Sequence, residues 1–598
     1  MPLMSDAPAI EVDLADGISH APAEWEKETA AVLRKSRRLS EDAPDSDVWT
    51  VLATSTLDGI TVTPLGTAQL VADLPDPGLP GQAPFTRGSS ATRELEGWDV
   101  RAWFADPDVE RTRQDVITDL ENGVNSLWIT VGRGGVPIES LAAVLEAVFL
   151  DLAPVALDAP HEPVAAAKAL AAIFADRVIS PAPGTSFGVD PIGAGFRDRG
   201  NTDSSIIEEV ARIAAPLGIR ALTVDATAVH DAGASDVQEL AYSLAAGTEY
   251  LRVLVDAGFS VDEAAGLIDF RYAATGEQFP TIAKFRAARR LWNRVVELSG
   301  GAATGQLQHA VTSRPMMAKY DPYVNMLRTT VAAFAAGVGG AASVTVLPFD
   351  ERLGLPDAFS RRIARNTSSL LISESHVAEV TDPAGGSYAV EKLTDDTARA
   401  AWELFGKIDA TGGLDVLEAA IAATVSQRAL AIAKRKQPIT GVSEFPNLHE
   451  TLPERRPYAS LLDVHRYGGE FEAMRDDRAA TPVFLATMGT VAAYTARATF
   501  AANLFAAGGV DIVTAGPTEG VDEIVAAYNE AGSGPVVCLT GNAAAYDAWG
   551  ADLVTALRAA GAEYVVVAGK SSLDIDATAA VGDDALAFLR SIRQELGA

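Results

Sequence analysis

The chain has 598 residues, of which 48% are hydrophobic and 21% charged, so its composition is that of a folded globular protein long enough for two or more domains. Its formal net charge of −32, from 48 basic and 80 acidic residues, argues against nucleic acid and anionic membranes as partners, because both would be repelled. The single cysteine, Cys538, excludes a disulfide framework and a cysteine-rich metal site, and it suits a reducing compartment.

Residues 1–14 differ from a secretory signal. They include acidic residues and no lysine or arginine, whereas a signal begins with a basic segment followed by an apolar one. No stretch of the chain approaches the roughly 20 uninterrupted apolar residues that cross a bilayer. The sequence therefore predicts a cytoplasmic protein. The next segment, Ala23 to Arg38, is helix-prone, and we expect residues 1–50 to form an N-terminal helical arm.

Residues 51–396 show the alternation of strands and helices that builds a (β/α)8 TIM barrel. Short apolar runs alternate with amphipathic stretches such as Val237 to Ala257 and Thr281 to Leu298. Each such stretch is long enough to be a right-handed crossover between parallel strands. The eight expected strands are Trp98 to Phe104, Ser126 to Val131, Pro154 to Asp158, Ser186 to Val189, Ala221 to Asp225, Ile268 to Tyr272, Leu307 to Thr312 and Ser343 to Leu347.

The sequence pattern of residues 397–598 predicts a helical region and a linker, followed by a second α/β domain. Residues 397–480 begin alanine-rich and helical, and they become rich in proline, glycine and charge after Gln437, which is typical of a linker. Residues 481–598 show a second strand and helix alternation, which favours an open, doubly wound sheet of flavodoxin type. Its four expected strands are Val483 to Thr487, Val510 to Thr514, Val536 to Leu539 and Tyr564 to Val567.

Motifs along the whole chain resemble those of methylmalonyl-CoA mutases. In chain order they are Pro84-Phe85-Thr86-Arg87-Gly88, Asp231-Ala232-Gly233-Ala234, Glu239-Leu240-Ala241-Tyr242, Ala283 to Arg289, Thr312-Ser313, Asp321-Pro322-Tyr323, Leu347 to Glu351, Leu355-Pro356, Arg361 to Thr367 and Asp382 to Tyr388. In such proteins a TIM barrel holds acyl-CoA in its axis, and a flavodoxin-like (Rossmann-like) domain holds adenosylcobalamin against the barrel mouth. The resemblance implies an isomerase that interconverts methylmalonyl-CoA and succinyl-CoA by a radical rearrangement, with the cofactor supplying the difficult chemistry.

The cobalamin motif of the family's catalytic members is lost. In those members a histidine in a D-x-H-x-x-G loop ligates cobalt, and a lysine precedes the motif. Aligned on Met488-Gly489, the lysine falls on Thr487, the aspartate on Val491, the histidine on Ala493 and the final glycine on Ala496. Neither valine nor alanine can coordinate cobalt. We therefore expect no cofactor-binding residue in this chain, and adenosylcobalamin of the complex on a partner subunit.

The catalytic positions of the barrel are lost as well. The family's catalytic histidine falls on Ala228, and its catalytic tyrosine is replaced by Trp103, which lacks the phenol. His230 stands two positions from Ala228. Because such a shift at a strand end changes both depth and loop geometry, we interpret His230 as a structural or surface histidine rather than a replacement catalyst. Ser90-Ala91-Thr92-Arg93 replaces the CoA-contacting Y-A-T-M of the family, so no catalytic residue is expected.

Two further motifs have a structural and a functional interpretation. Arg361, Arg362 and Arg365 could bind a phosphate, but we expect a solvated helix face paired with neighbouring acids. Asp382 to Tyr388 could cradle a ligand, but we expect a tight turn between barrel and linker. No Walker sequence occurs, and the histidines are too scattered for a metal site, so no metal is expected. The seven histidines are His20, His161, His230, His309, His376, His449 and His465.

Three functions are compatible with these patterns. The first is the small subunit of a heterodimeric mutase, a catalytically degenerate paralogue that supports the catalytic large subunit. That partner would hold the cofactor and the acyl-CoA, and the arm of residues 1–50 would wrap it. The second is a self-sufficient acyl-CoA mutase of altered substrate that uses His230. The third is a regulatory subunit that senses acyl-CoA and keeps a pocket in its barrel. Retained fold motifs with lost site motifs favour the first.

Overall fold

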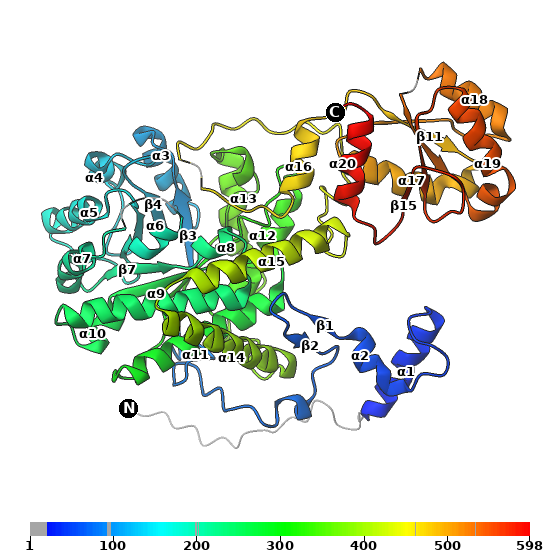
Figure 1. Cartoon of the computed structure of the whole chain (residues 1–598). Coiled ribbons are helices and arrows are strands. Elements are labelled where there is room, and N and C mark those ends of the chain that lie inside the picture. The colour runs from blue at the N-terminus through cyan, green and yellow to red at the C-terminus, as the bar shows by residue number, and fades with distance from the viewer. Residues whose placement is uncertain (1–20, 93–96, 198–199, 201, 461, 533) are drawn as a thin grey trace.

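The computed structural model describes residues 21–92, 97–197, 200, 202–460, 462–532 and 534–598. They form a helical arm, a barrel, a helical extension with a linker, and a C-terminal α/β unit (Figure 1). The mixed α/β class expected from the sequence is confirmed.

The arm contains two helices that pack on each other. Helix α1 (Pro22–Lys35) covers the expected segment, with proline in its first turn, where no backbone donor is needed. The turn η1 (Asp45–Asp47) leads into α2 (Val48–Leu52), and the short hairpin of β1 (Thr54–Ser55) and β2 (Thr61–Val62) leads on to η2 (Ala68–Val71). Figure 1 shows α1 and α2 projecting away from the barrel.

Eight parallel strands close into a barrel in the order β10-β3-β4-β5-β6-β7-β8-β9. Every expected barrel strand is confirmed, with ends that differ by no more than two residues. The strands are β3 (Asp99–Phe104), β4 (Ser126–Thr130), β5 (Val155–Asp158), β6 (Ser186–Val189), β7 (Arg220–Asp225), β8 (Ile268–Ala274), β9 (Gln308–Thr312) and β10 (Ser343–Thr345). Closure leaves no exposed sheet edge.

Helices surround the barrel. They are α3 (Val109–Leu120), α4 (Leu141–Val144), α5 (Pro163–Arg177), α6 (Pro191–Phe196), α7 (Ile206–Ala214), α8 (Thr227–Asp231), α9 (Asp236–Asp256), α10 (Val261–Gly266), α11 (Gln278–Leu298), α12 (Val324–Val338) and α13 (Ala358–Ser369). Short turns η3 (Ile138–Ser140), η4 (Ala215–Leu217), η5 (Glu351–Leu353) and the π-helical η6 (Leu370–Glu374) complete the connections. Helix α9 begins with a capping box between Ser235 and Gln238, which satisfies two backbone donors at its start.

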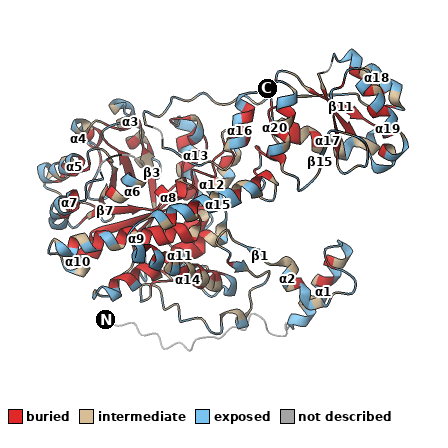
Figure 2. Cartoon of the chain, in the orientation of Figure 1, coloured by how far each residue is buried: buried red, intermediate tan, exposed pale blue. Residues whose placement is uncertain are grey.

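Two long helices beyond the barrel cover part of its helical layer. Helix α14 (Tyr388–Thr411) packs on α9 and α11, and α15 (Asp415–Ala433) packs on α9 and α14. As a result α9 and α11 are largely buried (Figure 2). Among the described residues, α15 is the one helix that is long and apolar enough to cross a membrane by composition.

The linker holds one helix that the sequence pattern did not predict. Helix α16 (Gly469–Asp476) lies in the segment expected to be irregular, and it buries Phe471 and Met474. The helix has only eight residues and several of them are charged, so the sequence shows no clear apolar periodicity there. Figure 1 shows the segment before α16 passing over the barrel beside α13 towards the C-terminal unit.

The C-terminal unit is a five-stranded parallel sheet in the order β12-β11-β13-β14-β15, which is the flavodoxin order. Its strands are β11 (Val483–Thr487), β12 (Ile512–Thr514), β13 (Val536–Thr540), β14 (Tyr564–Ala568) and β15 (Ala577–Ala579). Helices α17 (Val491–Ala507), α18 (Val521–Glu530), α19 (Ala543–Ala559) and α20 (Ala585–Glu595) complete it, with one hydrophobic cluster on each face of the sheet. The four expected strands are confirmed, and β15 was missed because three residues carry no pattern.

Candidate functional site: the barrel axis and the edge of the C-terminal sheet

The barrel axis is filled by large side chains from opposite strands. The rings of Trp103 on β3 and Trp128 on β4 stack with centroids 5.5 Å apart. The guanidinium of Arg271, on β8, lies 4.3 Å from the Trp128 ring, and His309 meets the same ring edge-on at 5.4 Å. Strands β4 and β8 are four apart in an eight-stranded ring, so these contacts cross the axis. Aromatic and cationic groups therefore occupy the channel that runs through the barrel.

A network of hydrogen bonds connects these side chains. Arg271 donates through Nη1 to Asp225 (3.0 Å) and through Nε to His309 Nδ1 (3.1 Å), and Arg197 also donates to Asp225 (3.0 Å). His309 Nε2 then donates to Thr345 Oγ1 (2.8 Å), since its other nitrogen is an acceptor. Burial opposes ionisation of Asp225, but Arg197 and Arg271 outweigh burial and hold the pKa of Asp225 below its usual range.

The imidazole of His309 is held neutral by the same surroundings. Burial first, and then the charges of Arg101 and Arg271, lower the pKa of His309 well below its ordinary value. At the other end of the axis Arg101 donates to Ser126 Oγ (2.7 Å) and to the Gly184 carbonyl (3.3 Å). The interior is thus occupied from end to end by paired polar groups, whereas a TIM barrel is more often filled by branched aliphatic residues.

The linker covers the mouth of the barrel. The ring of Tyr458 stacks on Trp103 at 5.5 Å, and Arg466 pairs with Glu351 at 3.3 Å. The guanidinium of Arg314 lies 5.4 Å from the Trp103 ring. These groups leave a cavity of about 60 Å³ at the mouth. Ligand pockets usually measure roughly 300–1,000 Å³, so the cavity is much smaller than a site for an acyl-CoA.

The barrel positions predicted to be degenerate lie around this filled mouth. Ala228 is buried in α8, and Trp103 is half-buried at the axis. His230 also lies in α8 rather than at a strand end. It is buried, with Nε2 2.7 Å from Ser313 Oγ and Nδ1 3.7 Å from Glu239 Oε2, so a surface role is excluded. Burial, followed by the charge of Lys284, lowers the pKa of His230 well below its ordinary value.

The expectation of a solvated arginine face on α13 is wrong for two of three residues. Arg361 and Arg365 both pair with Asp119 of α3, and Arg361 also lies 4.3 Å from the Phe104 ring. Arg361 is buried and Arg365 half-buried, because α13 packs against α3 and β3. Arg362 is exposed, as expected.

The segment Asp382 to Tyr388 contains the expected turn, in which the Gly385 amide donates to the Asp382 carbonyl. The turn is anchored because the buried Asp382 carboxylate accepts from Arg286 (3.2 Å) and from Arg87 (3.0 Å). These contacts join three family motifs that lie far apart in the sequence, so all three have a structural use.

The positions predicted to align with the family's cobalamin motif lie where β11 meets α17. Thr487 ends β11, and its hydroxyl donates to the Gly516 carbonyl, while Thr518 Oγ1 donates to the Thr487 carbonyl (2.7 Å). Val491, Ala493 and Ala496 lie in the first two turns of α17. The stretch aligned with the family's ligand loop is therefore mostly helix here, and these three positions offer only hydrocarbon side chains.

Other side chains fill the edge of the sheet beside these positions. The guanidinium of Arg497 lies 4.6 Å from the Tyr546 ring, and Tyr546 OH accepts from the Gly541 amide (3.1 Å). A Cβ added at Gly569 would lie 3.4 Å from the guanidinium carbon of Arg497, so this arginine covers the glycine after β14. Residues 481–598 contain no histidine. Within the described parts of the chain, no three His, Cys, Asp or Glu side chains are grouped as for a metal ion.

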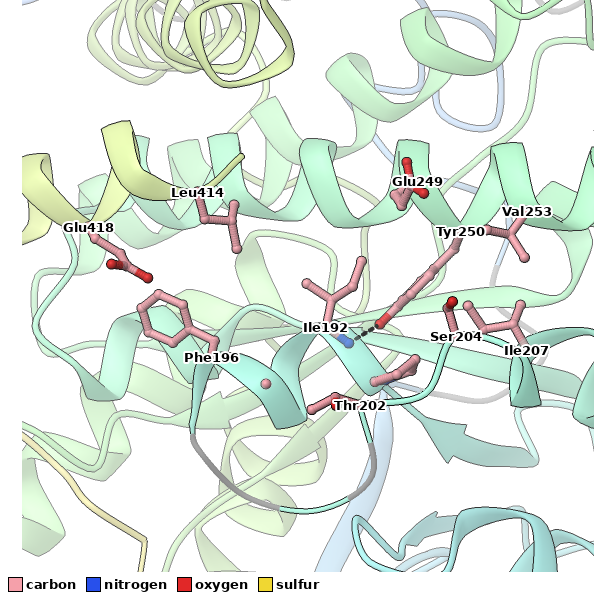
Figure 3. Close-up of a pocket in the computed structure, with 12 residues that line it drawn as sticks. Ile192, Phe196, Thr202, Ser204, Ile207, Glu249, Tyr250, Val253, Leu414 and Glu418 are labelled. Atoms are coloured by element: carbon pink, nitrogen blue, oxygen red, sulfur yellow. Dashed lines mark hydrogen bonds between the residues drawn. The ribbon is translucent and has the colours of Figure 1, made fainter. Parts of the chain in front are cut away.

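A separate hollow lies outside the barrel (Figure 3). Its volume is about 300 Å³, and it is bounded by Phe196 of α6, Ile207 of α7, Tyr250 of α9 and Leu414 before α15. Tyr250 OH accepts from the Ile192 amide at 3.0 Å, the contact drawn in Figure 3, so its hydroxyl is engaged with the backbone. The lining is mainly apolar and is formed by helices outside the barrel strands.

The fold and these two altered sites define an α/β protein in which a parallel barrel carries a flavodoxin-like unit. A family model described as methylmalonyl-CoA mutase matches residues 211–528. The "Methylmalonyl-CoA mutase small subunit" of Streptomyces virginiae is 48% identical, covering 96% of each chain. The protein of the same name from Propionibacterium freudenreichii subsp. shermanii is 38% identical over 91% of this chain and 88% of that one. The "Methylmalonyl-CoA mutase" of Cereibacter sphaeroides is 30% identical over 68% of this chain and 63% of that one. This chain belongs to the methylmalonyl-CoA mutase family.

Proposed function

We propose that this chain is the small, non-catalytic subunit of a cytoplasmic, heterodimeric methylmalonyl-CoA mutase, in which a large subunit holds adenosylcobalamin and acyl-CoA. The observation that carries the proposal is the filled barrel axis, with a cavity of about 60 Å³ at its mouth. The chain then has no catalytic residue, and Ala228 and Trp103 mark where the family's catalytic groups would stand. Its close relatives are named as small subunits, which supports the same assignment.

Opening the barrel to acyl-CoA would require breaking the network on the axis. Arg271 would have to leave both Asp225 and the Trp128 ring. A buried charge that loses its partner is strongly disfavoured, by about 3–5 kcal/mol in measured cases. The closed form is therefore favoured, which argues against the regulatory alternative that senses acyl-CoA in the barrel.

Cobalamin does not fit the residues present in the C-terminal unit. Cobalt needs an imidazole or comparable ligand, and Thr487, Val491, Ala493 and Ala496 supply none. Arg497 and Tyr546 fill the edge that a nucleotide tail would have to approach. We assign the cofactor to the large subunit, and no reaction step is assigned to this chain.

The self-sufficient alternative would need His230 as its catalytic group. The imidazole is buried where α8 packs against α9 and β8, and Nε2 is already engaged with Ser313. A low pKa and the lack of exposed ring surface make His230 a poor proton donor for a substrate. These features support a structural role for it.

The arm supports a role in assembly. In its described part, residues 21–50, the buried apolar core consists of Ala30, Leu33, Leu39 and Val48, and the Trp25 and Trp49 rings contact each other at 4.5 Å. A unit of about 30 residues with so small a core is marginal by itself, because chains below about 40 residues usually need further support. A large subunit lying against the arm would supply that support, so we assign residues 1–50 to partner wrapping.

Reconstitution tests the proposal. The chain and the large subunit are purified separately, and mutase turnover is measured for each alone and for the mixture. The proposal predicts no turnover by this chain alone, and a mixture that is active as a heterodimer in sedimentation. Turnover by this chain alone would contradict the proposal, and so would the lack of any complex between the two chains.

A further inference from the structure

One face of the barrel's helical layer is apolar although it is exposed. On α12 the exposed residues Tyr323, Leu327 and Val331 follow one another at intervals of four, with exposed fractions of 54%, 68% and 36%. Residues spaced by four lie on one side of a helix. Phe359, at the start of α13, is 42% exposed, and Leu370, just past its end, is 49% exposed. We call these five residues the α12–α13 face.

Contacts between the two helices connect part of this face. Helices α12 and α13 pack together, and a row of rings connects their first turns. In that row the Tyr323 and Phe349 rings stack at 5.1 Å, and the Phe349 and Phe359 rings meet edge-on at 5.9 Å. Contiguous exposed apolar surface of this kind marks interaction sites on folded proteins, whereas single exposed apolar residues are ordinary.

The composition of α12 sets it apart from other helices of the same layer. Its only charged residue is Arg328, which donates to the Thr440 carbonyl of the linker (2.8 Å) rather than standing on the apolar face. By contrast α7 presents the solvent-exposed pair Glu208 and Arg212 (2.7 Å). An outer helix normally shows such a polar face to water, so α12 has the composition of a helix covered on both sides.

We infer that the α12–α13 face is the surface through which this chain binds the large subunit, an inference that rests on the proposed function. The charge at the surface favours a different chain over a second copy. The exposed Arg362 lies over Phe359, with its guanidinium 5.4 Å from the ring. In a symmetric pair of this chain the same patch meets itself, so Arg362 would lie near its own copy, and two chains of net charge −32 would repel each other. The surface fits an apolar partner face with acidic side chains opposite Arg362.

The test replaces one central residue in the full-length chain. Leu327→Asp places a charge in the middle of the face, and the matched control is Leu152→Asp, at a residue that is 75% exposed just before β5, on the opposite side of the barrel ring. Affinity for the purified large subunit is measured by sedimentation velocity. We expect Leu327→Asp to weaken the complex by about 100-fold or more, as for a central contact residue, and Leu152→Asp to bind as the unaltered chain does.

A second variant tests the same surface through its charge. Arg362→Glu is expected to weaken the complex by roughly 10-fold and to reduce its sensitivity to salt, and Arg362→Lys to bind nearly normally. Unaltered affinity of both Leu327→Asp and Arg362→Glu would overturn the assignment of the surface while leaving the subunit proposal standing. Lack of any complex with the unaltered chain would overturn the subunit proposal itself. A homodimer of this chain that Leu327→Asp converts to monomer would show that the face binds a second copy instead.

Discussion

The two regions predicted to correspond to the family's substrate and cofactor sites differ from each other in what occupies them. At the barrel axis, four large side chains contact one another and occupy the interior. They are Trp103, Trp128, Arg271 and His309. At the edge of the C-terminal sheet, the positions predicted to align with the family's cobalt-binding motif, Val491, Ala493 and Ala496, carry hydrocarbon side chains on a helix. The first region is filled by contacts between large side chains, and the second carries small or apolar ones.

This difference has consequences for stability. The axis network joins strands on opposite sides of the barrel, so losing one member leaves buried charges without partners. The α17 positions are exposed or half-buried and make few contacts, so they should tolerate substitution. The predictions below sharpen the contrast, beginning with the largest expected effect.

Replacement of Arg271 by methionine should destabilise the protein most. The change leaves Asp225 with Arg197 as its remaining guanidinium partner and removes the contact with Trp128, so we expect a loss of about 3–5 kcal/mol in the free energy of unfolding. Urea denaturation followed by tryptophan fluorescence measures it. The control is Arg252→Met, which breaks the exposed pair with Asp409 and should cost less than about 1 kcal/mol. Equal losses for the two variants would contradict the account.

Replacement of Trp103 by alanine should destabilise the barrel by about 2–4 kcal/mol. It removes the stacks with Trp128 and Tyr458 and the hydrogen bond from Nε1 to Thr130 Oγ1 (3.0 Å). Among the described residues, the buried Tyr458 hydroxyl has no hydrogen-bond partner. Tyr458→Phe is therefore the matched control, which keeps the ring and should change stability by less than about 0.5 kcal/mol. A Trp103→Ala protein as stable as this control would show that the mouth is not held by stacking.

The pH dependence of the free energy of unfolding should report the ionisation of Asp190, a half-buried carboxyl at the barrel mouth. Burial, followed by the charge of Asp225, raises the pKa of Asp190 from 3.8 to about 6 in the folded protein. The folded state therefore binds this proton more tightly than the unfolded state. Ionisation of Asp190 therefore lowers the free energy of unfolding. The full loss is present above about pH 6, and there is no loss below about pH 4.

Asp190→Asn removes this titration. The stability of the variant relative to the unaltered protein should rise by about 2–3 kcal/mol between pH 4 and pH 7, measured by urea denaturation at each pH. Parallel stability curves for the two proteins would exclude a raised pKa for this carboxyl.

Restoring the ligand positions should have the smallest effect. The triple variant Val491→Asp, Ala493→His and Ala496→Gly places the family's motif on α17, where the substituted residues are exposed or half-buried. We expect a loss of about 1 kcal/mol, chiefly from glycine within a helix, and no binding of adenosylcobalamin, because Arg497 and Tyr546 still fill the edge. Absorbance titration measures binding. Micromolar binding by the variant would show that the ligands alone had been missing.

The elements with a strong local pattern could be predicted from the sequence. Runs of branched apolar residues indicated all eight barrel strands and four of the five C-terminal strands. The prediction that no cobalt ligand is present also rests on local sequence, because Ala493 and its neighbours stand next to the landmark Met488-Gly489. Strand β15 and helix α16 were missed because three and eight residues are too few for a period to emerge.

The features that depend on distant contacts could not be predicted. Arg361 is buried because Asp119, some 240 positions earlier, reaches it from α3. The replacement of tyrosine by Trp103 was visible, but the ring of Tyr458 that covers it comes from the linker. His230 has an ordinary sequence context, and only the packing of α8 against α9 and β8 reveals its burial. The sequence predicts which family groups are lost, and the structure shows which side chains lie at those positions.

The most direct test of the central claim is a titration of adenosylcobalamin against the purified chain, the purified large subunit and their complex, followed by absorbance. The account predicts no binding by this chain, and about one cobalamin for each complex of the two chains. Stoichiometric binding by this chain alone, or two cobalamins in the complex, would contradict the claim that its cofactor site is lost.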